Sequence, residues 1–241
     1  MQRKKFIQVS AMGLVGLSSI SFADFQSQYT KGDLMGKGNP TLIGEGHKLR
    51  KKAHQAFLKM KSAALEQGIK LKVVSSYRDY KHQNRIWERK YERYTASGLS
   101  PTKAIHKIIE YSTIPGTSRH HWGTDLDIVD GSVKQPKSVL LEKHFLNEGP
   151  FTRFKTWMDH NANNFGFYLV YTNKKDRKGF KYEPWHYSYA PLSVPMLKEF
   201  KKLDIKSELQ KTVLMGSSNF TSEFIQQYMD QNVLDINPKL L

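Results

Sequence analysis

Apolar and polar residues follow one another along this chain with the spacing of helices and short strands. A helical period appears near residue 47, and one face of the predicted helix carries Leu49, Ala53, Ala56, Phe57, Met60 and Ala64. Gly68 follows at a position where a glycine commonly ends a helix. Ile69, Leu71 and Val73 then alternate with two lysines, a pattern that predicts a half-buried strand.

The rest of the pattern predicts four more helices, a helical C-terminal segment and further strands. Ser100 and Pro101 suit the N-cap and the first position of one helix, and Ser193 is expected to cap another. A polar loop is expected at 116–123, and one or two peripheral helices at 205–241. Three more strands are predicted, at 124–129, 167–171 and 182–189. Short, separated strands mixed with helices favour an α+β fold.

The first 23 residues have the parts of a secretory signal peptide. Three basic residues near the start precede an uncharged, mostly apolar stretch, 6–20, and Ser21 and Ala23 are small residues at the cleavage positions. The apolar stretch is too short to favour a membrane span. We therefore expect a protein exported to the periplasm or cell envelope, without a transmembrane segment after signal removal. Residues 24–46 hold five glycines and few large apolar groups, which predicts a loop or a loosely docked N-terminal arm.

Composition narrows the possible partners and chemistry. The 241 residues include 38 Lys and Arg against 22 Asp and Glu, a net charge of +16, which is typical of proteins that bind nucleic acid or an anionic surface. Export argues against nucleic acid and favours an anionic cell-wall polymer. The chain has no cysteine, which excludes disulfides, thiol catalysis and Cys-ligated zinc. Any metal must be held by histidine and carboxylate.

Two dense polar segments, 118–127 and 183–186, contain three of the nine histidines. A catalytic zinc needs about three protein ligands, an open position and a nearby carboxylate that is not a ligand. The two segments supply these groups. Spacing alone leaves open whether His120 or His121 is a ligand. It also leaves open Asp125 or Asp127, because residues two apart share one face of a strand. The alternative interpretation is a polar surface strand with one hydrogen-bonded histidine.

Three motifs stand out in order along the chain. They are Ser76-Tyr77-Arg78 with Gln83, Ser118-x-His120-x-x-Gly123-x-x-x-Asp127, and Glu183-Pro184-Trp185-His186. Together they resemble the motifs of the VanY-like D-alanyl-D-alanine metallocarboxypeptidases, which are related in fold to the vancomycin-resistance D,D-dipeptidases and the hedgehog signalling domain. The resemblance implies an α+β fold in which a small antiparallel sheet carries a zinc site and packs with several helices. Asp125 departs from the family pattern, which usually has alanine at this position.

The resemblance implies a role for each motif residue. The ligands of one zinc ion per chain would be His120, Asp127 and His186. Glu183 would be the general base, and Arg78 would face the carbonyl or the carboxylate of the substrate. The residues that bind substrate in the pocket would be Ser76, Gln83 and Ser118. Residues 47–204 would form the zinc peptidase domain, and 205–241 a C-terminal helical extension.

The implied function is a zinc-dependent carboxypeptidase that removes a terminal D-alanine from peptidoglycan stem peptides. The sequence does not separate D,D- from L,D-specificity and gives no oligomeric state. One alternative is a peptidoglycan endopeptidase of the same fold. Another is a non-catalytic, hedgehog-like binding module that contains zinc. Glu183 argues against the binding module, because a structural zinc site needs no additional carboxylate.

Overall fold

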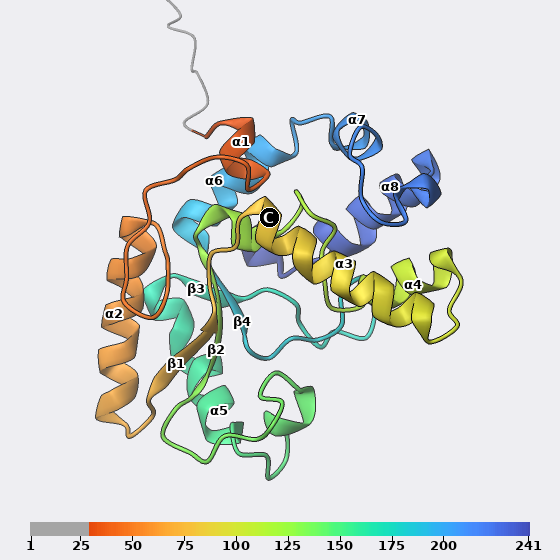
Figure 1. The fold of residues 1–241 in the computed structure, drawn as a ribbon. Helices are drawn as coiled ribbons and strands as arrows, with labels where there is room; N and C mark the ends of the chain where they lie inside the picture. Colours follow the sequence, from red (N-terminus) through yellow and green to blue (C-terminus); the bar gives the residue numbers. More distant parts are fainter. Residues whose placement is uncertain (1–28) are drawn as a thin grey trace, which may run out of the picture.

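The computed structural model describes residues 29–241, so the predicted signal peptide lies outside the described residues. Within that range the chain forms four strands and eight α-helices (Figure 1). The strands are β1 (Leu71–Ser75), β2 (Asp125–Asp130), β3 (Phe167–Leu169) and β4 (His186–Tyr189). The helices are α1 (Lys31–Leu34), α2 (Lys51–Glu66), α3 (Tyr80–Ala96), α4 (Pro101–Ile108), α5 (Thr152–Asn161), α6 (Ala190–Phe200), α7 (Ile205–Gln210) and α8 (Ser222–Tyr228). This arrangement confirms the predicted α+β class.

The four strands form one small sheet in the order β1-β2-β4-β3, in which all neighbours are antiparallel. On β2 and β4 the residues directly opposite each other are Asp125 and Ser188, Leu126 and Tyr187, and Asp127 and His186. Side chains alternate between the two faces of a strand. The polar pairs therefore share one face of the sheet, and the apolar pair lies on the other.

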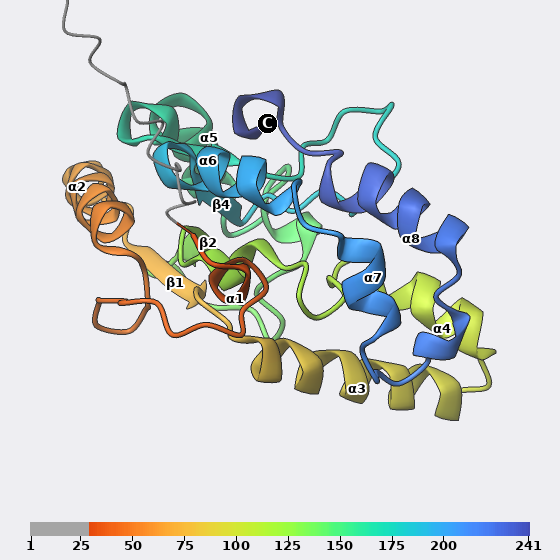
Figure 2. The same ribbon diagram turned by 90° about the horizontal axis from the view of Figure 1, so that it is seen from above.

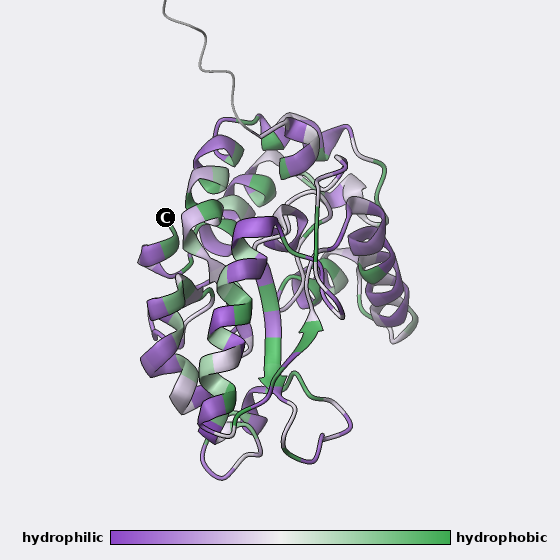
Figure 3. Cartoon of the chain, turned by 90° about the vertical axis from the view of Figure 1, so that its left-hand side faces the viewer, coloured by the Kyte–Doolittle hydropathy of each residue, from purple (hydrophilic) through white to green (hydrophobic). Residues whose placement is uncertain are grey.

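The apolar face of the sheet packs on α2 and α5. Leu126, Ile128 and Tyr187 share a buried cluster with Phe57 of α2 and Phe154 of α5. The buried stripe of α2 agrees with the predicted helical face, and its members are Ala53, Phe57, Met60 and Ala64. The helices in general show bands of hydrophilic and hydrophobic residues, as expected where one face of each is buried (Figure 3).

A second buried cluster lies beyond the polar face of the sheet. It joins Trp87 of α3, Ile105 of α4 and Leu197 of α6 to residues of the C-terminal segment. Viewed from above, α7 and α8 lie beside α3 and α4 (Figure 2). The polar face of the sheet therefore lies inside the protein, with one apolar cluster behind the sheet and the other in front of it. No helix within residues 29–241 is long and apolar enough to cross a membrane.

The C-terminal segment is helical as predicted, and its apolar stripe is buried against the rest of the fold. Tyr228 is buried, and its hydroxyl accepts a hydrogen bond from Ile114 N at 3.0 Å and pairs with Thr117 Oγ1 at 2.7 Å. Trp87 Nε1 donates to Met215 O at 2.9 Å. The apolar stripe of α8 thus packs into the same cluster as α3 and α4 and supports the segment that carries the site.

The N-terminal arm is also more tightly held than its glycine-rich sequence predicts. Leu34 is buried, and its carbonyl accepts a hydrogen bond from Trp122 Nε1 at 3.0 Å. Gly36 has φ +72°, and a Cβ atom there would lie 2.4 Å from His121 Nδ1. The absence of a side chain at Gly36 therefore permits the arm to pack against the 118–123 segment.

One local prediction is wrong. Ser193 does not cap α6, which begins at Ala190, and lies buried inside that helix. The segment 116–123 is polar in sequence but fully buried, and part of it forms a short 3₁₀ turn, η1 (Arg119–Trp122). His120, His121 and Trp122 of this segment each find a hydrogen-bond partner in a distant part of the chain.

Candidate active site

The 3₁₀ turn η1 brings His120 to the polar face of the sheet. Ser118 caps this turn, with its Oγ accepting a hydrogen bond from His120 N at 3.3 Å. Gly123 follows the turn with φ +67°, a left-handed conformation that turns the chain into β2. The Ser-x-His-x-x-Gly spacing thus has a local structural cause, since it places a cap before the histidine and a reversal after it.

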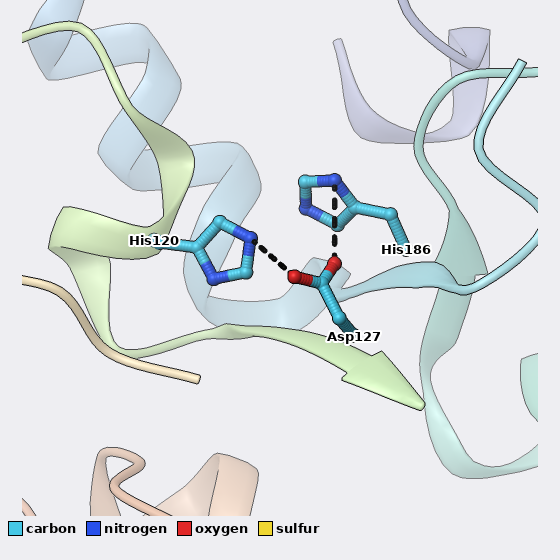
Figure 4. A group of neighbouring side chains, drawn as sticks. All are labelled: His120, Asp127 and His186. Atoms are coloured by element: carbon cyan, nitrogen blue, oxygen red, sulfur yellow. Dashed lines mark ion pairs between the residues drawn. The ribbon is translucent and has the colours of Figure 1, made fainter. Parts of the chain in front are cut away.

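His120, Asp127 and His186 form a buried group on this face, with one ligand-type atom from each lying within 4.8 Å of the others (Figure 4). His120 Nε2 lies 3.6 Å from Asp127 Oδ2, and His186 Nδ1 lies 4.0 Å from Asp127 Oδ1. Asp127 Oδ1 is buried and has no hydrogen-bond partner. Two imidazoles and a carboxylate with an unsatisfied oxygen are a donor set that fits zinc.

Each histidine is oriented by an acceptor on its far nitrogen. His120 Nδ1 lies 2.7 Å from Ser76 O, and His186 Nε2 lies 3.0 Å from Asp125 Oδ2. Such contacts fix the tautomer and ring orientation of metal-binding histidines. They leave His120 Nε2 and His186 Nδ1 facing Asp127.

The structure separates the candidates that spacing alone left open. His121 is buried away from the group, with Nδ1 2.6 Å from Arg78 O and Nε2 accepting from Gly116 N at 3.2 Å. Burial lowers the pKa of His121 to about 3, so the ring is neutral at pH 7. It holds Arg78 beside the turn that carries His120.

Asp125 belongs to a buried network behind His186. Its carboxylate accepts hydrogen bonds from Arg119 Nε at 3.1 Å, Thr124 Oγ1 at 2.7 Å and Ser188 Oγ at 2.6 Å, in addition to the His186 contact. Burial would raise the pKa of Asp125, but the Arg119 guanidinium and His186 hold it well below its usual range. The residue that departs from the family pattern is thus a fully satisfied buried carboxylate.

Glu183 reaches the same group from a turn. The predicted strand at 182–189 begins only at His186, and Pro184 and Trp185 form the turn that precedes it. Glu183 Oε2 therefore lies 2.9 Å from His186 Nδ1, although the two residues are three apart. Burial raises the pKa of Glu183, while His186 opposes the shift. Burial would also lower the pKa of His186, but its hydrogen bonds to Asp125 and Glu183 raise it to about 10.

The group opens into a pocket of about 410 Å³. Of the residues expected to act on substrate, Arg78, Gln83, Ser118 and Glu183 line it. The side chain of Arg78 carries a buried Nε without a hydrogen-bond partner. Ser76 differs from expectation because it is not among the lining residues. Its hydroxyl accepts from Lys48 N at 2.9 Å, and its carbonyl orients His120.

Sequence reasoning missed two groups of this pocket. Arg119 lines it from η1, and Lys90 lines it from α3, seven residues after Gln83 on the same face. The signal for Arg119 was the acidic Asp125 six residues later, which offers it a carboxylate partner. The signal for Lys90 was its helical register with Gln83, which identifies a pocket residue only once Gln83 is known to face the site.

Two histidines and an aspartate beside a separate glutamate, at the base of a pocket, are the composition of a metal-dependent hydrolase site. The sequence profile of the VanY family, described as D-alanyl-D-alanine carboxypeptidase, matches residues 46–192, more than half of the chain. The chain belongs to this family, as its three motifs predict.

Individual proteins and solved structures are also similar to this chain. The bifunctional D-Ala-D-Ala dipeptidase and D-Ala-D-Ala carboxypeptidase VanXYC of Enterococcus gallinarum is 33% identical over 134 residues, which are 55% of this chain and 62% of that protein. The chain therefore spans less than two thirds of that relative. VanYB, solved in complex with D-alanine-D-alanine, has a TM-score of 0.53 at 22% identity, covering 78% of this chain and 93% of that one. A mutant of the vancomycin-resistance D,D-pentapeptidase VanY, solved in complex with Zn(II), has a TM-score of 0.51 at 24% identity, covering 70% and 88%. These two likenesses show a shared fold.

Proposed function

We propose that this chain is a zinc-dependent carboxypeptidase that removes a terminal D-alanine from peptidoglycan stem peptides, with D,D- or L,D-specificity. The observation that carries the proposal is the buried group of His120, Asp127 and His186, with Glu183 beside it, at the base of a pocket in a VanY-family fold. The three grouped residues would hold one zinc ion. A bound zinc ion would supply Lewis-acid polarisation of the peptide carbonyl and would lower the pKa of water.

Glu183 is the general base in this proposal. Its carboxylate accepts a proton from the attacking water at Oε1 or Oε2 and later gives it to the amine of the departing D-alanine. Burial raises its pKa toward the range in which a carboxyl group can do both. The pocket is lined in part by Phe180 and Trp185, apolar surface that limits bulk water and strengthens the charge interactions near the peptide bond.

Arg78 and the polar lining residues hold the substrate. The guanidinium of Arg78 is a planar fork that matches a carboxylate or a developing oxyanion. Its backbone is fixed on both sides, because Arg78 N donates to His120 O at 3.1 Å and Arg78 O receives His121 Nδ1. Gln83 and Ser118 add polar groups to the same wall. Because its backbone is held by these hydrogen bonds, Arg78 can position the substrate without the closure of a loop.

The proposed location is the periplasm or the cell envelope. The support is the predicted signal peptide at 1–23. A strongly basic protein also suits an anionic wall polymer.

Defined peptides test the proposal. The purified protein with one equivalent of zinc is incubated with a stem pentapeptide and a stem tetrapeptide, and free D-alanine is measured. Release from the pentapeptide alone indicates D,D-specificity, and release from the tetrapeptide alone indicates L,D-specificity. Glu183→Ala is the matched control, because it removes the base and leaves the three grouped residues intact. Failure of the wild-type protein to release D-alanine from either peptide would overturn the proposal.

A further inference from the structure

Lys90 is a cation in the pocket wall that the proposed reaction does not use. It lies on α3, lines the pocket with Gln83 and Ile86, and its Nζ donates a hydrogen bond to Ser112 Oγ at 2.5 Å. Within the part of the chain that the structure describes, none of the ion pairs involves Lys90. Lys90 is half-buried, and its ammonium group has a neutral hydroxyl as its hydrogen-bond partner.

A half-buried ammonium that forms no ion pair with a carboxylate carries part of the cost of removing a charge from water. Burial lowers the pKa of Lys90 to about 8, although Glu183 opposes the shift, so the group still carries its charge at pH 7. A neutral side chain of similar length would fill the same wall without this cost. A charge kept at such a position is expected to meet an anion when the pocket is filled.

The geometry of α3 indicates which part of a peptide would meet Lys90. Gln83 and Lys90 are seven residues apart on one helical face, and at 1.5 Å per residue this corresponds to about 10 Å along the pocket wall. An extended peptide covers that distance with about three residues. A carboxypeptidase substrate has a single residue beyond the bond that is cleaved. A group this far along the wall from Gln83 therefore lies beside the part of the peptide that precedes that bond.

We propose that Lys90 forms a subsite for a carboxylate that the stem peptide carries on the N-terminal side of the cleaved bond. This inference rests on the proposed function and makes it more specific. Stem peptides offer two such groups, the α-carboxylate of the γ-linked D-glutamate and, where the third residue is diaminopimelate, the carboxylate of its side chain. The subsite would favour stems that keep these carboxylates over stems that are amidated there or have lysine as the third residue.

A set of four peptides tests the subsite. They have the length that the wild-type protein cleaves and combine D-glutamate or D-isoglutamine at the second residue with diaminopimelate or lysine at the third. Steady-state rates are measured for wild type, Lys90→Met and Lys90→Arg. Arg89→Met is the matched control, because it removes one charge from the neighbouring, exposed position of α3, which does not line the pocket.

The expected result is a selective loss. Lys90→Met should lower kcat/KM by about 10- to 100-fold for peptides that carry the recognised carboxylate and leave the others within about twofold. Lys90→Arg should keep most of the preference, and Arg89→Met should leave all four rates unchanged. The peptide pair that shows the loss identifies which carboxylate is bound. Equal loss on all four peptides, or no loss on any, would overturn the subsite. Wild-type cleavage of the peptide with D-isoglutamine and lysine, which lacks both carboxylates, tests the proposed function separately, because it does not involve Lys90.

Discussion

Replacing Asp125 with alanine, the residue usual in the family, should destabilise this protein strongly. Arg119 is 2% exposed, and the substitution removes the one carboxylate that pairs with it within residues 29–241, Asp125 Oδ2 at 3.1 Å. Arg119 Nη1 already lacks a hydrogen bond, so Nε would become a second buried, unsatisfied donor. Removing one partner of a buried ion pair typically costs about 3–5 kcal/mol. For a protein of this size that lowers Tm by roughly 6–20 °C.

A double variant separates the ion pair from the contact with His186. Arg119→Met combined with Asp125→Ala removes both charges, so most of the lost stability should return. His186 Nε2 loses its acceptor in both variants, so zinc affinity should stay about 10- to 100-fold below wild type. Thermal melts without metal and chelator-competition titrations measure the two effects separately. A wild-type Tm for Asp125→Ala would refute the ion-pair argument. Recovery of zinc affinity in the double variant would show that Asp125 acts only by pairing Arg119.

Three further predictions concern the pocket. Glu183→Ala should retain one zinc per chain by metal analysis and lose about 10²- to 10⁴-fold in kcat, whereas loss of the metal would show that Glu183 is a ligand. Arg78→Lys keeps the charge but not the fork, so kcat should fall more than KM rises at an unchanged Tm, and unchanged kinetics would assign Arg78 a structural role. Burial lowers the pKa of Lys90 to about 8, so the preference for carboxylate-bearing peptides, measured as kcat/KM, should be full near pH 7 and fall as the pH rises through about 8. A preference that is constant from pH 6 to 10 would contradict this assignment.

The sequence predicted the elements whose apolar residues follow a simple period. The buried stripe of α2, the alternation of β1 and the Ser100-Pro101 start of α4 all appear where the pattern indicates. Motif resemblance singled out His120, Asp127 and His186, and the structure brings these three residues together. Spacing alone could not choose between Asp125 and Asp127, and both do lie on the same face of β2.

The remaining features depend on contacts between distant segments, which periodicity does not report. The segment 116–123 is a polar loop as predicted, but its pattern does not show that His121 is satisfied by Arg78 O and Thr117 by Tyr228, more than a hundred residues away. The stripe of α8 predicts a helix without identifying its partner. The exposure of Lys90 is likewise set by its contact with Ser112 and by the pocket around it. Both arise only when the chain has folded.

Digestion of purified muropeptides, with products identified by mass spectrometry, tests the central claim most directly. Wild type and His186→Ala are each treated with a chelator, dialysed, and assayed before and after addition of one equivalent of zinc. The account predicts that stem peptides treated with wild type lose the mass of one D-alanine residue only when zinc is present. It also predicts that His186→Ala neither binds zinc nor releases D-alanine. Undiminished cleavage by metal-free wild type, or full zinc retention by His186→Ala, would contradict it.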